Sequence, residues 1–270
     1  MTGWPTSQVE PAFLSPEVSR SLNFATLSNR PMLERFLSSN DQDRAQRVIQ
    51  KLARHDPRSW VLTGGLAVEI HHVRRGAEPV RRPLNDIDFL APSFDCLPED
   101  LHKTFLFRHV HPFDPPGKTM LQAIDVDEAV RIDVFNDGGV ASGRADTLSL
   151  SGWETQIVSV EDLLARMARM TLNLAHGETV PPKHARDFFR LSKLADLERM
   201  EKVWPYHRRE NHPASFREAH DLLRGLIPYR QKLLITPAYS TAFEICERCI
   251  PTPYFQLADP KRLFSILGYY

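Results

Sequence analysis

The spacing of apolar residues divides the chain into three stretches. Residues 32–54 place apolar side chains at helical intervals, and the same period returns from Ser159 onward. Between them lie short apolar runs and alternating polar and apolar positions, which are typical of strands. We therefore predict an N-terminal helical arm at 1–56, a compact α/β core at 57–158 and a C-terminal helical domain at 159–270.

The core is predicted to contain a small mixed sheet. Trp60 to Leu62 is a short apolar run that indicates a buried strand, and the chain then turns at Thr63-Gly64-Gly65 into a helix over 66–73. A polar and basic loop at 74–85 leads to a strand at 86–90. The core lacks the regular alternation of strand and helix of a doubly wound sheet. The expected class is α+β, with a small mixed sheet, flanking helices and a helical C-terminal part.

The remaining elements follow the same two periods. Further strand-like runs lie at 119–124, 130–135 and 155–158, the first two of which we interpret as a hairpin. In the C-terminal part we expect helices at 159–176, at 183–197 and, in three or four pieces, over 213–270.

The composition of the chain argues against several classes of partner, framework and location. The 270 residues carry 34 basic and 34 acidic side chains, and this balance lowers the expectation of a long nucleic acid as partner. The three cysteines argue against a disulfide framework. The sequence shows neither an apolar run of membrane-spanning length nor a secretory signal, so we expect a cytoplasmic protein without a membrane partner.

Three aspartates form the strongest candidate for chemistry. In the strand predicted at 86–90, Asp86 and Asp88 project to the same side and Ile87 points into the core. The run Arg131 to Phe135 repeats this alternation and carries Asp133. If the two strands are neighbours, three carboxylates share one face. Such a cluster is stabilised by cations, and hard oxygen ligands suit Mg²⁺.

Gly64 and Gly65 supply a second element of a phosphate site. Glycines let the backbone approach a ligand closely, and the helix that follows points its N-terminus at phosphate charge. A Gly-Gly turn alone, or an Asp-x-Asp pair alone, is more often structural. The chain has a second pair, Asp125 and Asp127, which we interpret as a hairpin bend. The combination of glycine turn and three strand aspartates favours catalysis.

These motifs, TGGLAVEIH, a basic loop, NDIDFL and RIDVF in this order, resemble the nucleotidyltransferase superfamily, with AbiEii-type toxin and aminoglycoside or lincosamide nucleotidyltransferases as the nearest variants. The resemblance covers about residues 60–135. It implies that Gly64 and Gly65 bracket a nucleoside triphosphate. It also implies that Asp86, Asp88 and Asp133 are catalytic and hold two Mg²⁺ ions, with Asp133 as candidate general base.

A weaker match lies in the stretch PKHARDFFRL. It resembles the helix that follows the core in AbiEii-type proteins and implies nucleotide binding by Lys183 and Asp187. The two residues are four apart and share a helix face, so an exposed ion pair without function is an equal alternative.

The resemblance implies an enzyme that transfers a nucleoside monophosphate from a triphosphate to a hydroxyl-type acceptor. The acceptor is left open between a small molecule, the end of a tRNA and a protein. The alternative is a non-catalytic module that binds nucleotide or a partner protein, for example an antitoxin, in a toxin–antitoxin or immunity system.

Other polar residues receive structural interpretations. The loop arginines Arg74, Arg75, Arg81 and Arg82 are individually more typical of a solvated loop, although the loop as a whole could contact triphosphate. His71 and His72 favour core or surface contacts. Cys246 and Cys249 have the spacing of a metal or redox pair, but their apolar neighbours favour packed thiols on a helix.

Overall fold

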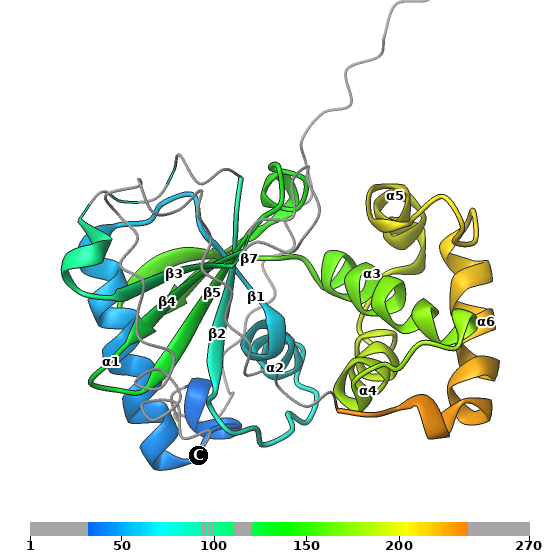
Figure 1. The fold of residues 1–270 in the computed structure, drawn as a ribbon, viewed down its shortest axis with the longest axis horizontal. Helices are drawn as coiled ribbons and strands as arrows, with labels where there is room; N and C mark the ends of the chain where they lie inside the picture. Colours follow the sequence, from blue (N-terminus) through cyan, green and yellow to red (C-terminus); the bar gives the residue numbers. More distant parts are fainter. Residues whose placement is uncertain (1–31, 93–95, 97, 99, 111–119, 237–270) are drawn as a thin grey trace, which may run out of the picture. The chain divides into compact units, whose positions relative to one another are not determined.

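The computed structural model describes residues 32–92, 96, 98, 100–110 and 120–236 (Figure 1). The predictions made for residues before Met32, for the helices beyond residue 236 and for Cys246 and Cys249 lie outside these residues.

Seven strands of the described chain form one mixed sheet in the order β3-β4-β5-β2-β1-β7-β6 (Figure 1). Their bounds are β1 Val61–Thr63, β2 Asp86–Ala91, β3 Leu106–Val110, β4 Met120–Asp125, β5 Val130–Asn136, β6 Asp146–Leu150 and β7 Trp153–Ile157. Two pairings, β2 with β5 and β1 with β7, are parallel, and the other four are antiparallel. The predicted α+β class with a mixed sheet is confirmed.

The predicted hairpin exists as β4 and β5, and the structure contains a second hairpin that was not predicted. Strand β6 pairs with β7 through a two-residue turn at Ser151 and Gly152, whose φ angles are 52° and 84°. Positive φ at both central residues is what a type I′ turn requires, and it matches the twist of the flanking strands. The strand predicted at 155–158 is therefore the second arm of this hairpin.

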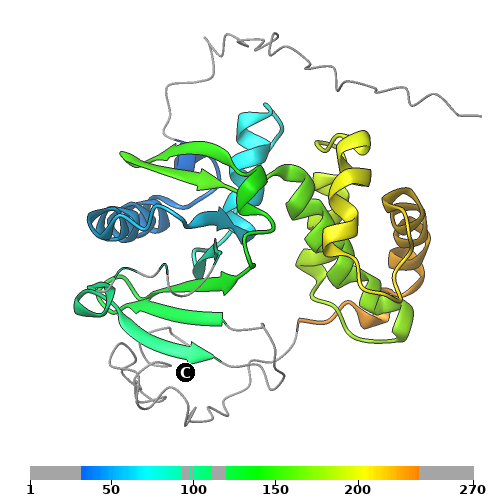
Figure 2. The same cartoon turned by 90° about the horizontal axis from the view of Figure 1, so that it is seen from above.

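Six α-helices accompany the sheet in the described residues. They are α1 Ser39–His55, α2 Gly64–Arg74, α3 Val160–Thr171, α4 Pro182–Leu191, α5 Leu197–His207 and α6 Phe216–Tyr229. Short 3₁₀ turns occur at Met32–Arg35, Leu101–Lys103, Ser142–Arg144, Leu172–His176 and Gln231–Leu233. Figure 2 shows α3 to α6 grouped together beside the sheet, which agrees with a helical C-terminal part.

One predicted helix boundary is wrong. The helix expected to run to Leu197 ends at Leu191, and a separate helix, α5, begins at Leu197. The Asp196 side chain accepts hydrogen bonds from the backbone N–H groups of Glu198 and Arg199, so it caps the new helix.

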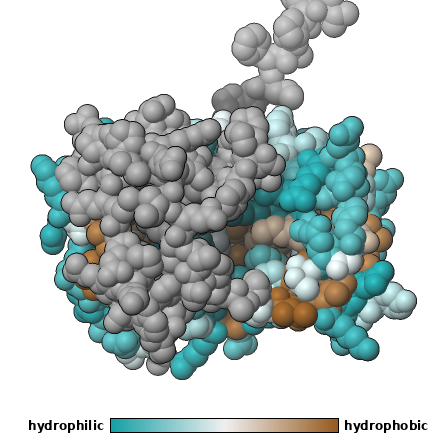
Figure 3. Space-filling model, in the orientation of Figure 1, coloured by the Kyte–Doolittle hydropathy of each residue, from teal (hydrophilic) through white to brown (hydrophobic). Residues whose placement is uncertain are grey.

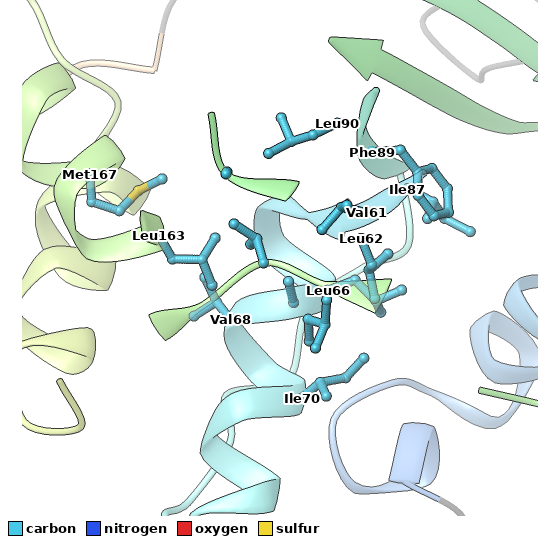
Figure 4. Packing of buried hydrophobic residues seen from close by; sticks show 14 of the residues in the cluster. Val61, Leu62, Leu66, Val68, Ile70, Ile87, Phe89, Leu90, Leu163 and Met167 are labelled. Carbon is cyan, nitrogen blue, oxygen red and sulfur yellow. The ribbon is translucent and has the colours of Figure 1, made fainter. Parts of the chain in front are cut away.

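Helix α2 is the element on which the core is built. Every residue from Leu66 to Val73 is buried, because α2 packs against β1 and β2 and also against α3. Figure 4 shows Val61, Leu62 and Ile87 around this helix, with Leu163 and Met167 of α3 on its other side. A helix that is buried on all sides needs apolar residues around its whole circumference, which explains the largely apolar run LAVEI.

No helix in the described part of the chain is both long enough and apolar enough to cross a membrane. Figure 3 shows mainly hydrophilic residues over the coloured surface of the helical part, with a smaller hydrophobic patch along its lower edge.

Candidate active site

Asp86, Asp88 and Asp133 lie together on the central strands. Strand β2 runs parallel to β5, and in this register Asp88 is the direct partner of Asp133. One carboxylate oxygen from each of the three residues lies within 4.8 Å of the others. Ile87, between the two β2 aspartates, is fully buried, as the alternation of a strand requires.

Two side chains of neighbouring strands bind these carboxylates. Arg131 precedes Asp133 by two residues on β5 and therefore shares its face. Its Nη2 donates to Asp86 Oδ2 at 2.5 Å, and its Nε donates to Asp133 Oδ2 at 3.0 Å. Gln122 on β4 donates from Nε2 to the other oxygen of Asp133 at 3.1 Å. Arg131 thus joins the two strands across the cluster.

The cluster carries more negative charge than Arg131 neutralises. Burial, together with the charges of Asp86 and Asp133, raises the pKa of Asp88 to about 7. Burial also raises the pKa of Asp133 to about 6, although Arg131 and Gln122 act in the opposite direction. Carboxyl groups whose ionised form is this unfavourable gain strongly from a bound cation.

Gly64 brings the turn after β1 against Asp88. Its φ is +69°, and a Cβ at this position would lie 1.8 Å from Asp88 Oδ2. Only glycine leaves room for the carboxylate there. Gly65 differs, because a Cβ added to it would lie 3.4 Å from its nearest neighbour, Arg82 Nη1.

The first turn of α2 points at the same place. Its N-cap, Thr63, makes no side-chain capping hydrogen bond, and Gly64, Gly65 and Leu66 line the cleft above the aspartates. The N-terminal N–H groups of a helix bind anions such as phosphate. The three clustered carboxylates and the N-terminus of α2 are therefore neighbours.

A cleft of about 450 Å³ lies between the sheet and the helical part. Its floor is formed by the three aspartates and Arg131, and its far wall by residues of α3 and α4. That wall carries Arg166, Lys183, His184 and Arg186. The Arg166 guanidinium lies over the Phe135 ring at 4.7 Å from its centroid. Basic side chains of α3 and α4 thus lie in the same cleft as the three carboxylates.

Lys183 and Asp187 both line the cleft, but they differ in exposure. Lys183 is exposed, whereas Asp187 is buried and accepts a hydrogen bond from Arg82. Arg82 also donates to Glu69, which is fully buried on α2. Arg190 binds both oxygens of Glu69 at 2.6 and 2.7 Å. This charge network ties the basic loop and α2 to α4 along one side of the cleft.

Within the basic loop, the structure distinguishes Arg82 from its neighbour. Arg81 is exposed, while the Arg82 side chain is 15% exposed and lines the cleft. His71 and His72 are buried and bind the backbone carbonyls of Val158 and Val68. They are core contacts, as expected.

Several cleft residues were not identified from the sequence. Arg131 could have been found, because the alternation Arg-Ile-Asp places it on the face of Asp133. Arg166 and Glu69 carry no comparable signal, since their partners come from distant segments.

Comparisons with known proteins give little beyond this geometry. No family model matches the chain, and no curated protein matches it. One similar solved structure is that of an antigenic nucleotidyltransferase-like protein from Paracoccidioides brasiliensis, at 18% identity and a TM-score of 0.41. The match covers 73% of this chain and 92% of that one.

Proposed function

We propose that this chain is a magnesium-dependent nucleotidyltransferase. It would move a nucleoside monophosphate group from a nucleoside triphosphate to a hydroxyl-type acceptor and release pyrophosphate. The observation that carries the proposal is the meeting of Asp86, Asp88 and Asp133 beside the turn at Gly64. The sequence motifs of the nucleotidyltransferase superfamily fall on these residues.

The donor set fits Mg²⁺. Three carboxylates from two adjacent strands offer hard oxygen ligands on an open cleft, and their charge exceeds that of Arg131, which pairs with two of them. Asp86 and Asp88 would hold two ions, and Asp133 one of them. Bound there, the ions would stabilise charge on the phosphate and on both oxygens of an in-line displacement.

The protein groups around the aspartates would hold the triphosphate. Gly64 and Gly65 let the N-terminus of α2 approach the phosphates, and Lys183 on the opposite wall would neutralise their charge. Asp187 would contribute to nucleotide binding indirectly, because it accepts a hydrogen bond from Arg82 and so holds this arginine in the cleft. Catalysis of this kind is mainly positioning and charge neutralisation.

The transfer is a single displacement at phosphorus. The acceptor hydroxyl oxygen bonds to the α-phosphorus, the bond from that phosphorus to the bridging oxygen breaks, and pyrophosphate leaves with the electron pair. Asp133 on β5 would accept the proton of the hydroxyl.

The test is transfer of label from α-labelled ATP, GTP, CTP and UTP in a cell extract with Mg²⁺. We expect one nucleotide to label one component, and its nature distinguishes a small molecule, a tRNA end and a protein as acceptor. Asp88→Asn and Asp133→Asn should abolish labelling. Full labelling by both variants would reject the proposal.

Asp127→Asn is the matched control. Asp127 belongs to the other Asp-x-Asp pair, is exposed and binds Lys51 at the end of the β4–β5 hairpin. The variant should therefore keep full activity. Nucleotide binding that depends on Mg²⁺ but never releases pyrophosphate would favour a non-catalytic nucleotide-binding protein instead.

A further inference from the structure

Arg131 occupies a position that the proposed function does not explain. It is the partner of two of the three candidate metal ligands, through Nη2 to Asp86 and Nε to Asp133. Its side chain is 14% exposed, so these ion pairs are largely shielded from solvent. The guanidinium thus places positive charge among the oxygens that would bind divalent ions.

A cation held there opposes metal binding in two ways. It occupies oxygens of Asp86 and Asp133, and its charge repels a divalent ion at short range. It also stabilises the metal-free cluster, where three carboxylates would otherwise repel one another. The strand pairing maintains this arrangement, because Asp86 is the direct partner of Arg131 across β2 and β5.

We propose that Arg131 is an internal counter-cation that keeps the metal affinity of this site low until nucleotide binds. This inference rests on the proposed function. A triphosphate entering the cleft brings oxygen ligands for the ions and offers Arg131 an alternative anionic partner. Metal and nucleotide would then bind with positive coupling, each raising the affinity for the other.

The position of Arg131 supports this role over a purely structural one. The carboxylates of Glu69 and Asp187, which pair with Arg82, are also buried. Their arginine partners, however, come from the loop before β2 and from α4, and not from the strands that carry the three aspartates. Arg131 instead binds two residues whose oxygens come within 4.8 Å of a third carboxylate. Arg131 is accordingly a positioning residue that acts through the metal ligands.

The experiment is direct titration with Mn²⁺, followed by its electron paramagnetic resonance signal, with and without a non-hydrolysable triphosphate. Arg131→Gln keeps hydrogen bonding but removes the charge, and Arg131→Met removes both. In the absence of nucleotide, both should bind Mn²⁺ at least about ten-fold more tightly than the wild type. Arg131→Lys, which keeps the charge, should stay close to the wild type.

The coupling with nucleotide gives a second readout. Triphosphate should tighten Mn²⁺ binding strongly in the wild type and much less in Arg131→Gln. Arg47→Gln is the matched control, because Arg47 pairs with Glu128 on the exposed hairpin end and should leave Mn²⁺ affinity unchanged. Thermal unfolding of each variant with Mn²⁺ checks that the fold is intact.

The outcomes separate the two proposals. If the wild type binds Mn²⁺ and the uncharged variants bind it equally or less well, the role of Arg131 is overturned while the metal site stands. If no variant binds Mn²⁺, both the role of Arg131 and the proposed function are overturned. Loss of binding in Asp88→Asn ties the signal to this cluster.

Discussion

Asp88 and Asp133 are direct partners on adjacent parallel strands, although 45 positions separate them in the sequence. The β2–β5 pairing therefore brings two carboxylates into one site that neither strand forms alone. A slip of one residue would turn Asp133 to the opposite face of the sheet. The buried residues Ile132 and Val134 hold the register, because the same slip would turn them to the face that Asp133 now occupies.

Replacing Asp88 by Asn should stabilise the metal-free protein while abolishing activity. The pKa of Asp88 is about 7 in the folded state, against an ordinary value of 3.8. The unfolded chain then binds fewer protons between pH 4 and 7, so wild-type stability falls as the pH rises through this window. Asp88→Asn avoids this loss and should be more stable at pH 8 by about 1–3 kcal/mol.

Urea unfolding at pH 5 and pH 8 measures the effect, which should be larger at pH 8. Added Mg²⁺ should raise the unfolding temperature of the wild type and leave that of Asp88→Asn unchanged. Equal stability of the two proteins at both pH values would contradict the charge account of the cluster.

Gly64→Ala and Gly65→Ala should differ sharply. An alanine at Gly64 would clash with Asp88 and would need a left-handed backbone, whose conformational cost alone is about 1–2 kcal/mol. Gly65→Ala meets no such obstacle and should change stability by less than about 1 kcal/mol. Denaturant titrations and labelling assays compare them, and similar losses in both variants would show that the close approach at Gly64 is not the cause.

Arg82→Met and Arg81→Met form a second matched pair. Arg82 binds Glu69 and Asp187, both buried. Its removal leaves Glu69 paired with Arg190 but takes the hydrogen bond of Asp187, and should cost about 1–3 kcal/mol. Arg81 is exposed, and its replacement should change stability by less than about 0.5 kcal/mol. Equal unfolding midpoints for the two variants would show that the ion pairs of Arg82 do not stabilise the fold.

Asp162 should make the helical part sensitive to acid. This buried carboxylate binds Arg144 and His207 and accepts from the Ser159 hydroxyl. Burial would raise its pKa, but these partners hold the pKa at about 2. Its contribution is complete above pH 4 and is lost as the pH falls toward 2. Asp162→Asn should cost about 2–4 kcal/mol at pH 7 and little at pH 2.

The comparison is made by circular dichroism during urea unfolding at the two pH values. Asp221→Asn serves as the reference, because Asp221 is exposed on α6 and its replacement should change stability by less than about 0.5 kcal/mol. A stability difference for Asp162→Asn that persists unchanged at pH 2 would place the effect in packing rather than in the ion pairs.

The sequence was sufficient for those parts of the site that depend on local periodicity. Alternation alone predicted that Asp86 and Asp88 share a face, and the glycine turn was placed between a strand and a helix. The parallel pairing of β2 with β5 needed the structure, because strand neighbours depend on contacts far apart in the chain.

The features that were not predicted also divide into those with a local sequence signal and those that depend on distant contacts. Strand β6 and helix α5 had local signals: the Ser151-Gly152 turn for the first, and Asp196 followed by Met200, Val203 and Trp204 at helical spacing for the second. Arg81 and Arg82 are adjacent residues of one type in one loop. What distinguishes them is Asp187, 105 residues further along the chain. No local pattern could have separated them.

The order of the strands also bears on how the protein is made. Strand β1 pairs with β7, so the sheet cannot be completed until residue 157 has left the ribosome. A nascent chain that ends before Arg131 contains Asp86 and Asp88 without the arginine that pairs with Asp86. Arg131 and Asp133 are thus synthesised together on β5, so the last of the three carboxylates emerges with the arginine that pairs with it.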